Sequence, residues 1–255
     1  APAKRPWWLI AVGLAAVLVM ALVTLPAKIV AGQLARIGIE AVGFSGSVWN
    51  GRAHGLAWRS APLGDLQWSI APLELLRGRV GGELELARPD GSLATQFSVS
   101  LGGDLHLSGT QFTLPVAALA ALPVGMPRNW HGRVSGKFTQ VQVSHGWPAA
   151  VRGTLDMDGL IAPPPRNTSI GSYHIEIPDP QATDSADGAL QARVTDKEGP
   201  FSFEGRFTLT PDRNFLLEGT LAPRGTTPPA LVRSIELLGP PDANGRRSVS
   251  VSGTL

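Results

Sequence analysis

Residues 201–210 read FSFEGRFTLT, and in this stretch large apolar side chains alternate with polar ones. An alternation with a period of two is the pattern of a β-strand that has one face covered and the other face in water. A glycine, Gly205, stands inside the run, where glycine marks a bulge, a bend or the close approach of another backbone. The stretch therefore predicts a β-strand with an apolar face and a glycine in its interior.

The same alternation returns along most of the chain after Val42. Pro89-Asp90-Gly91 stands between two alternating runs and is a turn sequence, so residues 82–101 are predicted to form a hairpin. The fold class that follows is mainly β, with mostly antiparallel pairing. The other alternating stretches are residues 48–58, 96–101, 105–107, 130–143 and 189–194.

Glycine recurs inside the predicted strands, next to an aliphatic or aromatic residue. Glycines repeated along a sheet let it coil strongly instead of staying flat. We therefore expect a strongly curved, partly barrel-like sheet; the alternative is that each glycine belongs to an independent turn. The five segments that carry this pattern begin at Val134, Val151, Phe203, Leu217 and Val251.

Three apolar stretches that begin near a proline and end near a glycine interrupt the strands, at residues 71–78, 115–122 and 228–238. Proline suits the first turn of a helix and glycine the position after its last turn. A few short helices are therefore predicted, unless the repeat is a coincidence in a chain rich in Gly and Pro. We interpret the Pro-rich residues 160–187 as long loops with a strand at residues 172–177 between them. Because the repeat continues across this region, we expect one continuous β-rich domain over residues 41–255.

Residues 7–25 read WWLIAVGLAAVLVMALVTL and contain no charged residue. A helix of this length, at a rise of ~1.5 Å per residue, spans roughly 28 Å, about the thickness of the hydrocarbon core of a bilayer. The segment is therefore predicted to be a single transmembrane helix, with Trp7, Trp8 and Leu25 as its membrane anchors. A cleaved signal peptide is the alternative, but its apolar core is usually shorter and ends at small residues.

The residues on either side of this segment predict its orientation and its continuation. Lys4 and Arg5 precede it, so the positive-inside rule puts residues 1–6 in the cytoplasm and the remainder of the chain across the membrane. Residues 26–40 place apolar side chains at helical spacing with Lys28 and Arg36 between them. We expect these residues to form an amphipathic juxtamembrane helix.

No catalytic or cofactor-binding constellation can be recognised in the sequence. There is no Cys, which excludes thiolate zinc sites and cysteine nucleophiles, and the five His residues stand apart from one another. Asp156-Met157-Asp158-Gly159 begins like a calcium loop but lacks the later oxygen ligands, and we interpret it as a turn. No basic face that would bind nucleic acid is indicated. We therefore expect a binding or scaffolding protein without enzyme activity, cofactor, metal ion, nucleic acid or small-molecule substrate.

Several tryptophans follow the predicted membrane segment. Strict alternation would put Trp49 and Trp58 on opposite faces of one strand, unless a bulge at Gly51 or Gly55 changes the alternation. Such side chains bury large areas in cores and at interfaces, so core packing and a binding groove both remain open.

Residues 46–51, which read GSVWNG, and the apolar positions in residues 66–78 resemble protein N of the bacterial type II secretion system. The resemblance implies an accessory inner-membrane component of Gram-negative bacteria that supports the export of folded proteins, with residues 41–255 in the periplasm. It implies as partners the inner-membrane platform and, in addition, the secretin or the pseudopilus. The residues proposed as structural or partner-binding on this basis are Trp49, Trp58, Trp68, Pro72, Leu75 and Leu76.

A second interpretation stays open beside this one. Single-pass envelope proteins with glycine-rich curved sheets, such as AsmA-like proteins, can bind or transfer lipid between membranes. A lipid carrier should show an uninterrupted apolar concave face. A scaffold should show a filled interior and a contact patch with polar flanks.

Overall fold

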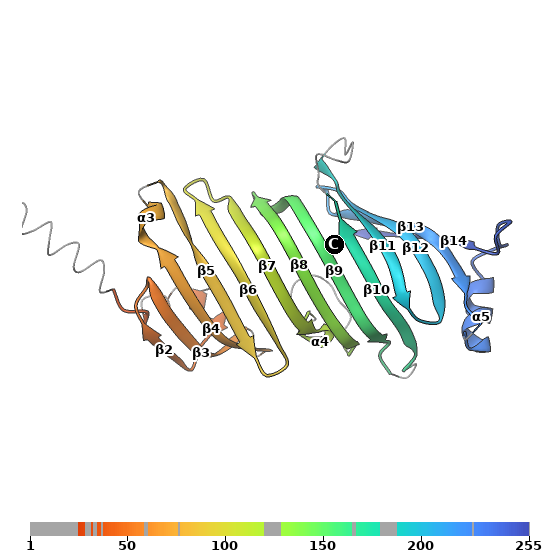
Figure 1. The fold of residues 1–255 in the computed structure, drawn as a ribbon, viewed down its shortest axis with the longest axis horizontal. Coiled ribbons are helices and arrows are strands. Elements are labelled where there is room, and N and C mark those ends of the chain that lie inside the picture. The colour runs from red at the N-terminus through yellow and green to blue at the C-terminus, as the bar shows by residue number, and fades with distance from the viewer. Residues whose placement is uncertain are drawn as a thin grey trace, which may run out of the picture. The chain divides into compact units, whose positions relative to one another are not determined.

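The computed structural model shows two compact units, of which the first ends at Arg88 and the second begins at Pro89 (Figure 1). The sequence had led us to expect one continuous domain over residues 41–255. Each unit is built from antiparallel strands. The residues that the structure describes are 25–28, 32, 35–36, 38–58, 61–75, 77–119, 129–164, 167–178, 188–225 and 227–254.

The predicted transmembrane helix lies outside the described residues except for its last residue, Leu25. Among the residues that are described, no helix has the length and apolar character needed to cross a membrane. Much of the predicted juxtamembrane helix over residues 26–40 also lies outside the described residues. Its predicted end is wrong by two residues, because Ile39–Glu40 form strand β1 and pair with residues 57 and 58.

The first unit is a small antiparallel sheet centred on β3. Strands β1 and β2 both pair with β3, β4 pairs with the other side of β3, and β5 pairs with β4. Its core contains Ala27, Ala53, Leu56 and Trp68. The elements are β1 (Ile39–Glu40), β2 (Gly43–Gly46), β3 (Asn50–Trp58), β4 (Ala61–Ala71), α3 (Pro72–Leu75) and β5 (Arg79–Arg88).

The second unit is one antiparallel sheet in which every strand pairs with the next strand along the chain, from β6 to β14. The prediction of a mainly β, antiparallel fold is confirmed, and the sheet is not closed into a barrel. Its core cluster joins Val116, Val134 and Leu160. The strands are β6 (Gly91–Ser100), β7 (Leu105–Pro115), β8 (His131–Ser144), β9 (Trp147–Ile161), β10 (Ser169–Ile177), β11 (Leu190–Glu198), β12 (Phe201–Leu209), β13 (Asn214–Pro223) and β14 (Arg247–Thr254).

All three short helices that the proline-started stretches predict are present. Helix α3 (Pro72–Leu75) lies within predicted residues 71–78, α4 (Val116–Leu119) within 115–122 and α5 (Pro229–Glu236) within 228–238. The fixed φ of proline and the absence of its N–H suit the start of a helix, which is why this signal is reliable here. The predicted turn at Pro89-Asp90 is also present.

The turn predicted at Asp156-Met157-Asp158-Gly159 is wrong, because these residues continue strand β9. Met157 is paired with Tyr173 and Val134 and shares their apolar face. Asp156 points to the other side and is bound by His174 and Lys197. Alternation across the strand therefore decides the local structure, although Asp and Gly taken alone favour a turn.

Glycines inside the second unit make room for aromatic rings. Gly205 and Gly219 are directly opposite each other on β12 and β13, and the ring of Phe203 lies over both. A Cβ atom added to Gly219 would stand 2.9 Å from that ring and 2.6 Å from the carbonyl oxygen of Glu204. These glycines permit a close approach between ring and backbone, one of the roles that the sequence left open.

We predict that Gly219→Ala destabilises the protein by about 1–3 kcal/mol, because the added methyl group must displace the ring of Phe203 or part the two strands. Gly225→Ala is the matched control, since a Cβ atom there meets nothing within 4 Å. Thermal unfolding of both variants measures the difference. Equal melting temperatures for Gly219→Ala and the unmodified chain would contradict the close packing described.

Candidate interaction surfaces

The GSVWNG stretch forms a tight connection between β2 and β3. Gly46 has φ +83°, a conformation that favours glycine. The Ser47 backbone N–H donates to the Asn50 carbonyl at 2.9 Å, and the Asn50 N–H donates to Ser47 Oγ at 3.1 Å. The two hydrogen bonds close the loop, and Gly51 follows it as the second residue of β3.

Trp68 of strand β4 packs against this connection. Its ring lies over Gly51, where a Cβ atom would stand 2.3 Å from the ring carbon Cζ2. Its indole Nε1 donates to the carbonyl oxygen of Val48 at 2.8 Å, and the residue is 4% exposed. The two halves of the segment that carries the family resemblance thus meet in one cluster, in which Trp68 is a core residue.

The chain that precedes the sheet enters the same cluster. The Val48 N–H donates to the Leu25 carbonyl at 2.9 Å, and the Ala27 N–H donates to the Gly46 carbonyl at 3.1 Å. Ala27 is 1% exposed. The residues that directly follow the predicted membrane segment are therefore held by backbone hydrogen bonds and by burial against the first unit.

Of the other residues proposed from the sequence, only Trp49 belongs to this connection, and its carbonyl accepts the Ile70 N–H at 2.6 Å. Trp49 precedes β3, and Trp58 ends it beyond a bulge at Gly55, so strict alternation does not relate their faces. Both rings are half-buried. Pro72 begins helix α3 and is exposed, and Leu75 in the same helix is 40% exposed. Leu76, like Trp7 and Trp8, lies outside the described residues.

In the second unit, the pairing register gathers mostly apolar side chains on one side of the sheet. One row of directly paired residues crosses the sheet without a polar member. It runs through Leu93, Phe112, Gly136, Leu155, Ile175, Val194, Gly205, Gly219 and Val249. We call the side of the sheet that carries this row the apolar face.

The neighbouring row lies on the opposite side of the sheet, because side chains next to each other in a strand point to opposite sides. We call this side the polar face, and every member of the row except the first is polar or charged. This row runs through Ala94, Gln111, Lys137, Thr154, Glu176, Arg193, Arg206, Glu218 and Ser250.

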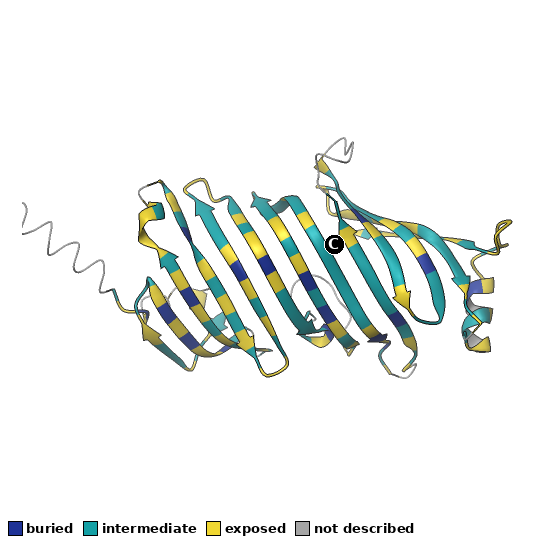
Figure 2. Ribbon diagram, viewed as in Figure 1, coloured by how far each residue is buried: buried dark blue, intermediate teal, exposed yellow. Residues whose placement is uncertain are grey.

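The apolar face is only partly covered by the described residues. Helix α4 packs Val116 against Val134 and Leu160, and these three side chains are buried. In the apolar row, every residue except Gly136 is half-buried, and Figure 2 shows the same intermediate class along most of the strands. Side chains beneath a second layer would be fully buried, so an apolar surface remains accessible.

A part-buried ion pair marks one margin of the apolar face. The carboxylate of Asp196, whose side chain is 8% exposed, accepts hydrogen bonds from Arg224 and from the Phe203 N–H. Tyr173 lies opposite Asp196, and burial together with the Asp196 charge raises the pKa of its phenol. The charge of Asp196 is thus neutralised by Arg224, and it does not interrupt the apolar row.

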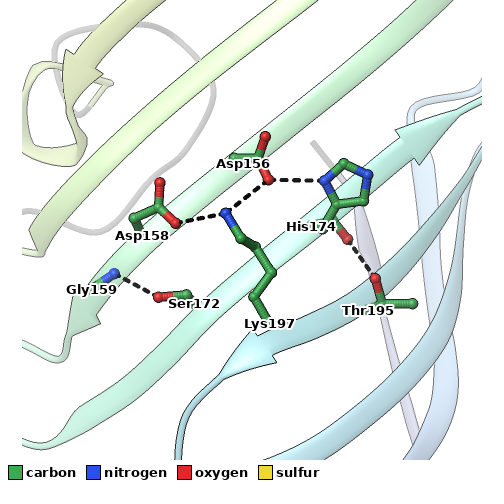
Figure 3. A network of polar contacts seen from close by, with 7 residues as sticks. All are labelled: Asp156, Asp158, Gly159, Ser172, His174, Thr195 and Lys197. Carbon is green, nitrogen blue, oxygen red and sulfur yellow. Dashed lines mark hydrogen bonds and ion pairs between the residues drawn. The ribbon is translucent and has the colours of Figure 1, made fainter.

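The polar face carries a network of ion pairs over β9, β10 and β11 (Figure 3). Lys197 Nζ lies 3.2 Å from Asp156 and 3.0 Å from Asp158, and His174 Nδ1 lies 2.8 Å from Asp156. The hydrogen bonds with His174 and Lys197 lower the pKa of Asp156, and those with Asp158 and Asp156 raise the pKa of Lys197. The charged groups of this network are thus paired with one another. Within the described residues, no group of three or more His, Asp or Glu side chains is arranged to hold a metal ion.

Comparison with known proteins gives consistent matches. The model of the family "Type II secretion system (T2SS), protein N" matches residues 37–250. A type II secretion system protein N of Aeromonas hydrophila is 28% identical over 260 residues, which cover 99% of this chain and 100% of the relative. The protein of the same name in Vibrio cholerae serotype O1 is 25% identical over 229 residues, 86% of each chain. No solved structure matches this chain.

We predict that Trp68→Ala destabilises the protein by about 3–5 kcal/mol, because it empties the centre of the first unit. Trp68→Phe should cost about 1–3 kcal/mol, because the Val48 carbonyl then lacks the indole N–H as a partner. Leu73→Ala, at a residue that is 74% exposed, serves as a control with little expected effect. Denaturant unfolding measures all three variants, and a Trp68→Ala variant as stable as the control would place the ring outside the core.

Proposed function

Because this chain belongs to the type II secretion system protein N family, we propose that it is an accessory inner-membrane component of that system. In this role it supports the export of folded proteins by binding other components, without catalysing a reaction. The observation that carries the proposal is the accessible apolar face of the second unit, which continues across nine strands. A contiguous apolar surface on a folded domain is typical of a site that another molecule covers.

The proposed mode of action divides the chain into an anchor and a binding surface. Residues 7–25 would hold the protein in the inner membrane, with residues 1–6 in the cytoplasm and the two units in the periplasm. Leu25 and Ala27 support this arrangement, because their hydrogen bonds and burial connect the end of the apolar segment directly to the first unit. The candidate partners are the inner-membrane platform, the secretin and the pseudopilus.

A second candidate function is supported by the same apolar row. Acyl chains require an apolar path without charged interruptions, and the row from Leu93 to Val249 contains no polar side chain. The apolar face could therefore bind lipid in the envelope instead of a protein partner. If the apolar face is altered, the first function predicts a loss of exoprotein release and the second a defect in lipid distribution. An experiment that measures both therefore distinguishes the two functions.

The test compares substitutions on the two faces of β11. Val194→Glu places a charge in the apolar row, whereas Thr195→Glu places the same charge on the polar face. In a strain that lacks the native gene, we expect Val194→Glu to reduce exoprotein release by about tenfold or more, since a buried unpaired charge costs several kcal/mol at an interface. Thr195→Glu should restore release.

Protease resistance of both variants shows that loss of release does not come from unfolding. Normal exoprotein release by the Val194→Glu variant, combined with defective phospholipid distribution, would favour the lipid function and contradict the secretion role. The proposed topology is checked by fusing alkaline phosphatase after residue 60, which should give an active enzyme. A fusion after residue 6 is the inactive control, and the reverse pattern would invert the topology.

A further inference from the structure

The outer side of strand β14 (Arg247–Thr254) carries unpaired backbone groups. One side of β14 pairs with β13 over eight residues, and in the described part of the chain no strand lies beyond it. Ser250, Val251 and Ser252 at its centre are all exposed, and Val251 is 48% exposed. Half of the N–H and C=O groups of such a strand point outward, where they can pair with another strand.

This edge lacks the features that usually prevent strands from pairing. Natural edge strands are protected by proline, by lysine, by bulges or by a very short length. Strand β14 contains neither Pro nor Lys, and its register with β13 runs from Arg247 to Thr254 without a shift. At the first residue of the strand, the Arg247 guanidinium donates a hydrogen bond to the Gly239 carbonyl of the preceding loop. The edge is therefore regular, exposed and able to accept a strand.

The sequence of β14 indicates which strand would fit. Residues 248–252 read SVSVS, which is the same in both directions. In an antiparallel pair the two strands run in opposite directions, so such a sequence is complementary to itself. We propose that two copies of this chain pair through β14, antiparallel and about a twofold axis at Ser250.

The side chains match at every position of this arrangement. Val249 of one copy lies opposite Val251 of the other, and both belong to the apolar face, since they pair with Gly219 and Leu217. On the polar face Ser250 meets Ser250, and Ser248 meets Ser252. Cross-strand pairs of β-branched residues and of hydroxyl residues are favourable in sheets.

The charged residue at the start of β14 also fits. Arg247 of one copy falls opposite Gly253 of the other, so two like charges do not face each other. Gly253 is covered by the ring of Phe215, where a Cβ atom would stand 2.7 Å from the ring. This places a guanidinium beside an aromatic ring, a pairing that is attractive. The contact is isologous, because each copy uses the same strand.

The pairing has a consequence for the apolar face. Directly paired residues in a sheet share one side, so the apolar row continues from Val249 into the second copy. The two apolar faces then form one surface over both copies. This inference does not depend on the proposed function, because it rests on the edge and sequence of β14 alone.

Disulfide formation tests both the contact and its register, because the chain has no Cys. Directly opposite residues have Cα atoms about 4.5–5.5 Å apart, within the range that a disulfide bridges. We expect the full chain with Ser250→Cys, purified in detergent, to form a reducible dimer on mild oxidation. Ser248→Cys chains alone should form at least about tenfold less reducible dimer. In the proposed pairing, residue 248 of one copy and residue 248 of the other lie about 14 Å apart along the strands, too far for a disulfide.

The register is confirmed if a mixture of Ser248→Cys and Ser252→Cys chains crosslinks while neither variant does so alone. Equal crosslinking of all three single variants would indicate random collision and overturn the proposal. So would a monomeric Ser250→Cys chain, or one that crosslinks in cells only to a different protein. Serine-to-cysteine changes at these exposed positions keep the fold, which the unchanged melting temperature of the reduced chains verifies.

Discussion

The register of the antiparallel strands in the second unit is the constraint on which the rest of the structure depends. A shift of one residue in any strand would move that strand's apolar side chains to the polar face. The register instead aligns Ile175, Val194 and Gly205 on one side and Glu176, Arg193 and Arg206 on the other. Ion pairs such as that between Lys197 and Asp156 reinforce the same alignment from the polar face. The apolar face, which the described residues cover only in part, is thus a consequence of how the strands pair.

The first unit contributes a different property, a fixed connection to the residues that precede the sheet. Trp68, Gly51 and the Val48 carbonyl form a compact cluster, and the same loop accepts and donates the hydrogen bonds that hold Leu25 and Ala27. If residues 7–25 are inserted in the membrane, a force on the anchor reaches the first unit without a flexible linker at this point. The proposed membrane anchor would thus be connected directly to the first unit.

Local patterns in the sequence predicted the strands and the short helices. The predictions that failed concern places where pairing between distant strands determines the structure. The alternation in residues 201–210 predicted β12, and prolines predicted the three short helices, because both signals act within a few residues. The turn predicted at Asp156–Gly159 was wrong, because partners on β10 and β11 hold both aspartates on a strand. A glycine inside one predicted strand and a tryptophan in the next could have suggested the packing of Trp68 on Gly51. The sequence did not show that these two residues are paired, because the register between β3 and β4 includes a bulge at Gly55. Such registers depend on bulges, and no single-strand pattern specifies them.

Cysteine labelling at two neighbouring residues of β10 tests whether the apolar face is the binding surface of the second unit. Ile175 lies on the apolar face and Glu176 on the polar face. In the purified full chain, Ile175→Cys and Glu176→Cys should both react with a maleimide, because the described residues place no second layer over β10 on either face. In cells that carry the complete secretion system, we expect Ile175→Cys to be protected and Glu176→Cys to be labelled as before. Equal labelling of Ile175→Cys in both settings, or protection of Glu176→Cys alone, would contradict the apolar face as the binding surface.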